Sequence, residues 1–162
     1  MIIKALSLKS PINNSMKFIK SAIVLFVILI SCNCLKAQVR HTSKSARTRL
    51  ALSIANGKVV YTQNCATCHQ IDGHGVPHMN PPLIQTTYVL GDKAKLIQIV
   101  LNGFSEDVEI NDNSYSNTMP AHDFLKDQQI ADVLTYIRNN FTNKASAVTV
   151  AMVKSIRASN KK

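Results

Sequence analysis

Apolar residues recur with helical spacing in three segments of the chain. Residues 52–64 place apolar side chains on one broad face, and residues 126–140 repeat them at the i, i+3, i+4 and i+7 positions. Residues 92–102 are apolar on more than one face, as in a helix that is covered on two sides. Because no convincing alternation with a period of two accompanies these segments, the pattern predicts an all-α domain.

Two irregular stretches separate the predicted helices. Residues 70–91 contain glycines and prolines that interrupt both helices and strands, and residues 103–118 are polar and rich in Asn and Ser. Asp92 can cap the start of the second helix, and Gly103 can end it. Beyond the third helix, spaced apolar residues within 142–162 predict a further short helix, packed outside the main domain.

The amino-terminal part of the chain contains a nine-residue apolar run, residues 22–30. Lys17 and Lys20 precede this run, and Ser31 and Cys32 follow it. A basic region, an apolar run of about 7–15 residues and a small-residue exit are typical of a secretory signal peptide. The run is too short for a transmembrane helix. The alternative to a signal peptide is a buried helix of the protein core.

The exit of this segment has two interpretations. Residues 29–32, Leu-Ile-Ser-Cys, resemble the bacterial lipobox, in which the cysteine, here Cys32, receives a lipid and becomes the mature amino terminus. Alternatively, an ordinary cleavage site lies between Ala37 and Gln38. Both predict export, either to a lipid-anchored position on the membrane or as a soluble periplasmic protein. Met16 is a candidate for the true initiation site, because a short basic region begins there, directly before the apolar run.

The formal net charge of +10 is concentrated in the chain ends. Residues 56–141 contain all nine acidic residues against five basic ones, a net charge of −4, so we expect no nucleic-acid partner.

A length of 162 residues suits one domain with extensions. The predicted parts are a signal peptide over 1–37, a basic linker over 38–50, a domain over 51–141 and a basic extension over 142–162.

The segment Cys65-Ala-Thr-Cys68-His69 is the attachment motif for c-type haem. Two thiols three positions apart reach the two vinyl groups on one edge of the porphyrin, and the next residue, His69, then lies beside the iron. A thioredoxin-like redox pair would require a βαβ pattern, which the sequence lacks. A structural zinc site would require a second closely spaced pair of ligands. His74 and His78 could be proposed, but the segment lacks the usual second half of such a site.

Four further motifs follow one another in a recognisable order: Gly57-x-x-x-Tyr61, Pro81-Pro82-Leu83, Thr118-Met119-Pro120 and the helical segment 131–138. Through these motifs and the haem motif, residues 56–141 resemble class I c-type cytochromes of the single-haem bacterial branch. The resemblance implies the cytochrome c fold, in which three main helices and their loops surround one covalent haem.

The resemblance also implies a role for several residues. Cys65 and Cys68 would attach haem c, and His69 would be the proximal iron ligand. The carbonyl of Pro81 or of Pro82 would accept the free ring N–H of the histidine. The first helix would cross the last one closely at Gly57.

The sixth iron ligand is the main open choice. Met119 lies 50 residues after His69 and directly before Pro120, as the axial methionine does in the family. His122 is an alternative, as is Met79, although Met79 follows His69 closely on the proline-containing loop. Tyr88 and Tyr115 are candidate hydrogen-bond donors to the haem propionates.

Ligation of the iron by His69 and Met119 would leave no open position for a substrate. The sequence therefore predicts a carrier of single electrons rather than an enzyme, with a dehydrogenase or a terminal oxidase as redox partner. A haem-based sensor or a peroxidase-like enzyme with a labile distal ligand is the alternative. A zinc-binding or disulfide-bonded interaction module is a third reading, and it predicts a colourless protein.

Overall fold

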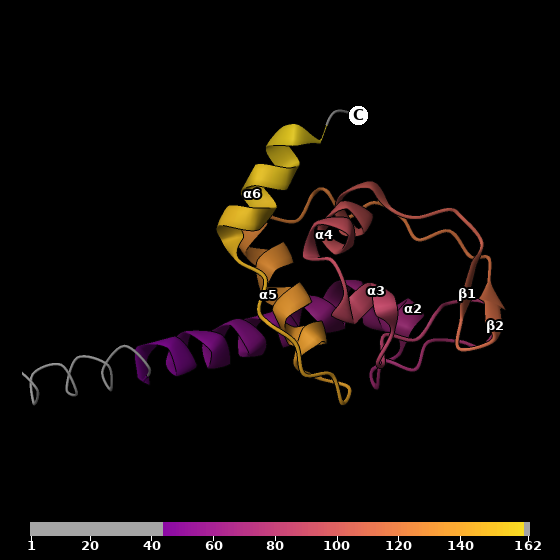
Figure 1. Ribbon diagram of the computed structural model, residues 1–162, viewed down its shortest axis with the longest axis horizontal. Helices are drawn as coiled ribbons and strands as arrows, with labels where there is room; N and C mark the ends of the chain where they lie inside the picture. Colours follow the sequence, from indigo (N-terminus) through magenta and orange to yellow (C-terminus); the bar gives the residue numbers. More distant parts are fainter. Residues whose placement is uncertain (1–43, 161–162) are drawn as a thin grey trace, which may run out of the picture. The chain divides into compact units, whose positions relative to one another are not determined.

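The computed structural model describes residues 44–160, and the compact unit treated below begins at Arg47. Residues 1–43, which contain Met16, Cys32 and the predicted signal peptide, lie outside the described residues. None of the helices in the described part is long and apolar enough to cross a membrane. In chain order the unit comprises a helix over residues 47–64, α2 (Ala66–His69), α3 (Thr87–Leu90), α4 (Lys93–Asn102), β1 (Val108–Ile110), β2 (Asn113–Tyr115), α5 (Asp127–Arg138) and α6 (Val150–Ser159) (Figure 1).

All three predicted main helices are present. The first includes residues 52–64 and also covers residues 47–51, so the described end of the predicted linker is helical. The second corresponds to α4, whose amino terminus is capped by the Asp92 side chain, which accepts a hydrogen bond of 2.9 Å from the backbone of Ala94. Gly103 follows α4 with a φ of 77°, which favours glycine. Both ends of α4 are thus confirmed.

The third predicted helix corresponds to α5, which is shorter at both ends than the predicted range. Lys126 precedes it as the cap residue, and its backbone N–H donates a hydrogen bond of 3.0 Å to the side chain of Gln129. At the other end, the backbone of Asn139 has left the helical conformation.

The first helix crosses α5 closely at Gly57, as predicted. A Cβ atom at this position would overlap the backbone carbonyl of Asp132 and would lie 2.7 Å from the Cβ of Tyr136. Tyr61, one turn further along, is fully buried, and its ring centroid lies 5.4 Å from that of Tyr136. The crossing fixes the direction of the helix that leads into the Cys65–His69 segment.

A short β-hairpin lies within the stretch predicted as a polar loop. The strands β1 and β2 pair antiparallel, with Ile110 opposite Asn113. The two connecting residues, Asn111 and Asp112, have φ angles of 53° and 60°, and positive φ at both positions is what a tight two-residue hairpin requires. Strands of three residues are too short to show alternation in the sequence. The fold class is nevertheless confirmed, because the unit is mostly helical with this one small sheet.

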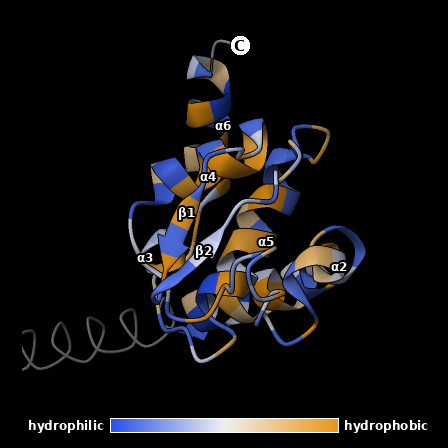
Figure 2. Cartoon of the chain, turned by 90° about the vertical axis from the view of Figure 1, so that its right-hand side faces the viewer, coloured by the Kyte–Doolittle hydropathy of each residue, from blue (hydrophilic) through white to orange (hydrophobic). Residues whose placement is uncertain are grey.

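The predicted additional helix at the carboxyl end is α6. It packs against α4 and α5, and Figure 2 shows apolar residues on these elements. Val148 and Val153 are buried in the same core as the α4 and α5 residues. The hydroxyl of Thr149 caps the helix by accepting a hydrogen bond from the backbone of Met152.

Two buried polar side chains connect the end of α5 to distant backbone. The Arg138 guanidinium donates to the carbonyls of Val89 and Gly91, and also to that of Ser146. The Asn143 amide donates to the carbonyl of Leu83 at 2.8 Å. Burial lowers the pKa of Arg138, and the three carbonyls accept hydrogen bonds from its Nε and Nη1 atoms. These contacts fix the chain between residues 83 and 91, which forms part of the site.

Candidate functional site

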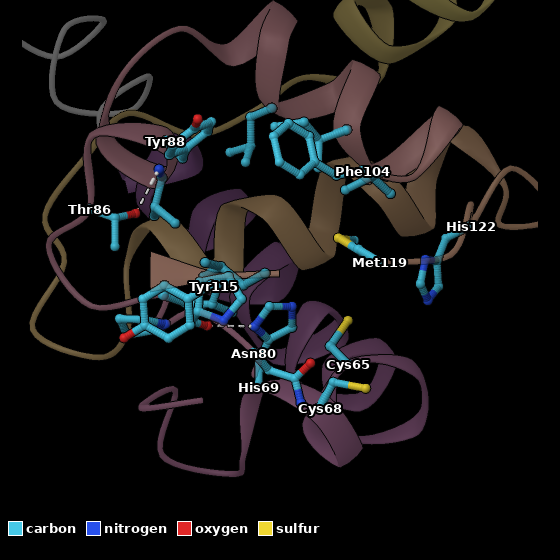
Figure 3. Close-up of a pocket in the computed structure, with 18 of the residues that line it drawn as sticks. Cys65, Cys68, His69, Asn80, Thr86, Tyr88, Phe104, Tyr115, Met119 and His122 are labelled. Carbon is cyan, nitrogen blue, oxygen red and sulfur yellow. Dashed lines mark hydrogen bonds between the residues drawn. The ribbon is translucent and has the colours of Figure 1, made fainter. Parts of the chain in front are cut away.

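A cleft with almost entirely apolar walls lies between the Cys65–His69 segment, α4, α5 and the hairpin region. It encloses about 1310 Å³ of empty space, part of which is open to solvent. The four predicted site residues, Cys65, Cys68, His69 and Met119, all line it. Figure 3 shows the first three close together and Met119 on a different part of the wall.

The two thiols come from the junction between the first helix and α2. Residue 65 forms a turn between the two helices, and Cys68 lies three positions further on within α2. Both cysteines are free, so the described structure contains no disulfide between them. Burial, with a smaller contribution from Cys68, raises the pKa of the Cys65 thiol to about 11. The thiol is therefore neutral at physiological pH.

His69 is held in one tautomer by a backbone carbonyl. Its Nδ1 atom lies 3.0 Å from the carbonyl oxygen of Pro81. Because a carbonyl only accepts hydrogen bonds, Nδ1 carries the proton and Nε2 keeps a free lone pair. Burial lowers the pKa of His69 and outweighs the opposing effect of the Pro81 bond, so the ring is neutral. Of the two prolines left open by the sequence, Pro81 is the partner.

The loop that carries Pro81 folds back on itself. The backbones of Val76 and Asn80 form a β-bridge, and a Cβ atom on Gly75 would overlap the Asn80 carbonyl. The Tyr61 hydroxyl donates a hydrogen bond of 2.5 Å to the carbonyl of Gln70 at the start of this loop. The buried Tyr61 of the first helix therefore fixes the backbone directly after His69, at the start of the loop that carries Pro81.

Met119 belongs to a segment that follows the hairpin. Its backbone exchanges two hydrogen bonds with Phe104, at 2.8 and 2.9 Å, and its side chain packs against the core. Met79, the alternative ligand on the His69-side loop, is 50% exposed and is not among the residues that line the cleft. His122 does line the cleft, and its Nδ1 lies 2.8 Å from the carbonyl of Pro120.

Other polar residues reach the same cleft. Tyr88 and Tyr115, the candidate propionate donors, both line it, and the Lys95 ammonium lies 4.9 Å from the centre of the Tyr88 ring. The sequence did not point to Thr86, which is buried beside the cleft and caps α3. The sequence also did not indicate that Arg138 holds the chain at Val89 and Gly91, because a basic residue near a helix end is usually solvated.

These residues fit a covalently bound haem. Two unpaired thiols and a neutral imidazole with a free Nε2 are adjacent, and a thioether lies elsewhere on the wall of the same apolar cleft. In the described part of the chain, no group of three or more His, Cys, Asp and Glu side chains could hold a metal ion by itself. The donor set is therefore that of an iron porphyrin rather than of a bare ion.

Comparison with known proteins agrees with this chemistry. Residues 54–141 match the cytochrome c family. Cytochrome c-552 of Thermus thermophilus is 38% identical over 92 residues, which cover 54% of this chain and 62% of that protein. The gluconate 2-dehydrogenase cytochrome c subunit of Pantoea cypripedii is 37% identical over 105 residues, 62% of this chain and 24% of that subunit. The Cbb3-type cytochrome c oxidase subunit CcoP of an Azospirillum species is 34% identical over 98 residues, 53% of this chain and 28% of that subunit.

The chain belongs to the cytochrome c family, and its domain is a class I c-type cytochrome with covalently bound haem c. The predicted family, fold class and cofactor are thereby confirmed. The chain covers less than two thirds of the length of each of these relatives.

Proposed function

We propose that this protein carries single electrons through one haem that is attached to Cys65 and Cys68 and ligated by His69 and Met119. The observation that supports this most directly is the His69–Pro81 hydrogen bond, which leaves Nε2 as the only free nitrogen of the ring. A bound haem c supplies the one-electron chemistry, cycling between ferrous and ferric iron. The chain supplies the ligands, their orientation and the apolar surroundings.

The choice of Met119 over Met79 rests on exposure and position. Met119 is half-buried in the wall of the cleft, whereas half of the Met79 surface is exposed. If His69 and Met119 both ligate the iron, no position would remain there for a substrate, so the protein would transfer electrons without making or breaking bonds.

The partners follow from the kinds of protein that contain similar domains. Relatives include cytochrome subunits of quinone-dependent alcohol dehydrogenase, gluconate 2-dehydrogenase and a cbb3-type oxidase. We propose a dehydrogenase as electron donor or a terminal oxidase as acceptor. Export through residues 1–37, with attachment of lipid to Cys32, would bring the domain to the periplasmic side of the membrane.

The ligand assignment is tested by replacing each methionine in protein produced with a cytochrome c maturation system. Met119→Ala should abolish the near-infrared band of sulfur–iron(III) ligation, lower the reduction potential and allow carbon monoxide to bind the reduced protein. Met79→Ala is the matched control and should leave all three properties unchanged. The opposite pattern, or a sulfur band that survives Met119→Ala, would contradict the assignment and indicate another methionine, with Met79 as the first candidate. Absence of the band from the parent protein would indicate His122 instead, which His122→Ala would test.

A further inference from the structure

Helix α6 lies beyond the part of the chain that matches the cytochrome c family, which ends at residue 141. It nevertheless contacts the chain on both sides of Met119. We define the Met119 segment as residues 119–125, which connect the candidate ligand to α5. The contacts of α6 with this segment and with α4 are specific hydrogen bonds in addition to apolar packing.

Arg157 makes the contacts with the Met119 segment. Its Nη1 atom donates to the carbonyl of Asp123 at 2.8 Å, and its Nη2 atom donates to the carbonyl of Leu125 at 2.6 Å. Its Nε atom donates to the carboxylate of Asp127 at the start of α5, also at 2.6 Å. The Arg157 and Asp127 side chains are only 32% and 27% exposed, so water competes weakly for these contacts. One planar guanidinium therefore binds the end of the segment at two points and the start of α5 at a third.

Asn160, the first residue after α6, makes the contact with α4. The side-chain amides of Asn160 and Asn102 exchange two hydrogen bonds, of 2.7 and 3.0 Å. Asn102 ends α4, and Phe104, two residues later, pairs with the backbone of Met119. The Phe104–Met119 bridge joins the chain after α4 to the Met119 segment. The end of α6 forms hydrogen bonds with both, through Asn160 to Asn102 and through Arg157 to the Met119 segment.

The first half of the Met119 segment has two backbone attachments of its own. One is the bridge to Phe104, and the other is the hydrogen bond of 2.8 Å from the backbone of His122 to the carbonyl of Val100. Both lie in the first half of the segment, whereas Arg157 binds the second half at the carbonyls of Asp123 and Leu125.

We propose that Arg157 is a positioning residue that holds Met119 in place as an iron ligand, and that α6 is a device added to the common domain for this purpose. The inference rests on the proposed ligation by Met119. An iron–thioether bond opens reversibly, and the open state admits an external ligand. Removing Arg157 should therefore increase the population of the open state without changing the ligands themselves.

The test compares two variants of the full-length holoprotein. Arg157→Gln removes the guanidinium, whereas Val153→Ala removes buried packing from the same helix and contacts no part of the Met119 segment through hydrogen bonds. The measurements are the carbon monoxide affinity of the reduced protein, the sulfur–iron(III) band and the thermal midpoint. Arg157→Gln should increase the affinity for carbon monoxide about tenfold. Val153→Ala should lower the thermal midpoint but leave this affinity within about twofold of the parent.

A gentler variant, Arg157→Lys, keeps the charge near Asp127 but cannot donate to both carbonyls. It should increase the affinity for carbon monoxide by a smaller factor, and it provides the test if Arg157→Gln yields no holoprotein. Carbon monoxide binding in the Arg157 variants equal to that of the parent, or an equal increase in Val153→Ala, would overturn the inference alone. Absence of the sulfur band from the parent protein would overturn the ligation by Met119 and the inference together.

Discussion

The two sides of the haem cleft differ in how far apart in the sequence their contacting residues lie. On the His69 side, both cysteines and the histidine lie within five consecutive residues, and the orienting carbonyl of Pro81 follows only 12 residues later. On the Met119 side, the contacts come from Phe104, which is 15 residues away, and from α6, more than 30 residues away. Hence the first side is defined by a local motif, whereas the second depends on the packed tertiary structure.

This difference predicts that substitutions on the two sides affect different properties of the protein. A change on the His69 side should affect attachment of the haem and the stability of the whole domain. A change on the Met119 side should affect the sixth ligand while the haem stays attached.

The largest effect should follow from removing both thiols on the His69 side. The Cys65→Ala, Cys68→Ala double variant cannot form a thioether, so covalent haem should be lost completely, as measured by mass spectrometry after acid denaturation. The parent protein should retain haem through the same treatment. Covalent haem in the double variant would show that the attachment site lies elsewhere.

The next largest effect should come from Gly57→Ala. Its new Cβ atom would overlap the Asp132 carbonyl, and the two helices would have to separate. We expect a loss of about 1–3 kcal/mol in the free energy of unfolding, measured by denaturant titration. The sulfur–iron(III) band of the folded protein should persist, because Gly57 packs against α5 and is not among the residues that line the cleft.

Gly103→Ala is the matched change on the Met119 side. The φ of 77° at this position disfavours alanine by about 1–2 kcal/mol, and its Cβ atom would lie 2.5 Å from the Met119 carbonyl. Here the haem should remain attached while the sulfur band weakens and carbon monoxide binds more readily. If Gly57→Ala and Gly103→Ala weakened the band equally, the two sides would not be separable.

The smallest effect concerns pH. Burial, with smaller contributions from neighbouring groups, raises the pKa of Tyr61 above its ordinary value of 10.0, which means that the folded state keeps the phenol protonated. The unfolded chain releases this proton above about pH 10, so the folded state loses stability as the pH rises further. Tyr61→Phe should make the free energy of unfolding less dependent on pH between about 10 and 11. An identical slope in both proteins would exclude Tyr61 as the cause.

The His69 side could be predicted from the sequence because its chemistry is local. The spacing from Cys65 to His69 is itself the signal for haem attachment. The choice between Pro81 and Pro82 could not be made in this way, because adjacent carbonyls of an irregular loop point in different directions. Their orientation is set by the bridge between Val76 and Asn80, which has no signature in the sequence.

The Met119 side could be predicted only in part. The Met-Pro pair indicated a ligand, and His122, the alternative ligand named from the sequence, lines the same cleft. Arg157 resembled an ordinary solvated basic residue in the tail, because its partners are carbonyls about 30 residues earlier. The hairpin was missed because its three-residue strands are shorter than any recognisable alternation.

The contacts of Arg138 have a consequence for sequence divergence. This side chain recognises only main-chain oxygens, those of Val89, Gly91 and Ser146, and no side chain takes part. Every amino acid provides the same oxygen, so the exposed residue at 146 can change during evolution without loss of the contact. Arg138 can therefore preserve the path of the chain beside the haem while the exposed surface at residue 146 acquires a new composition.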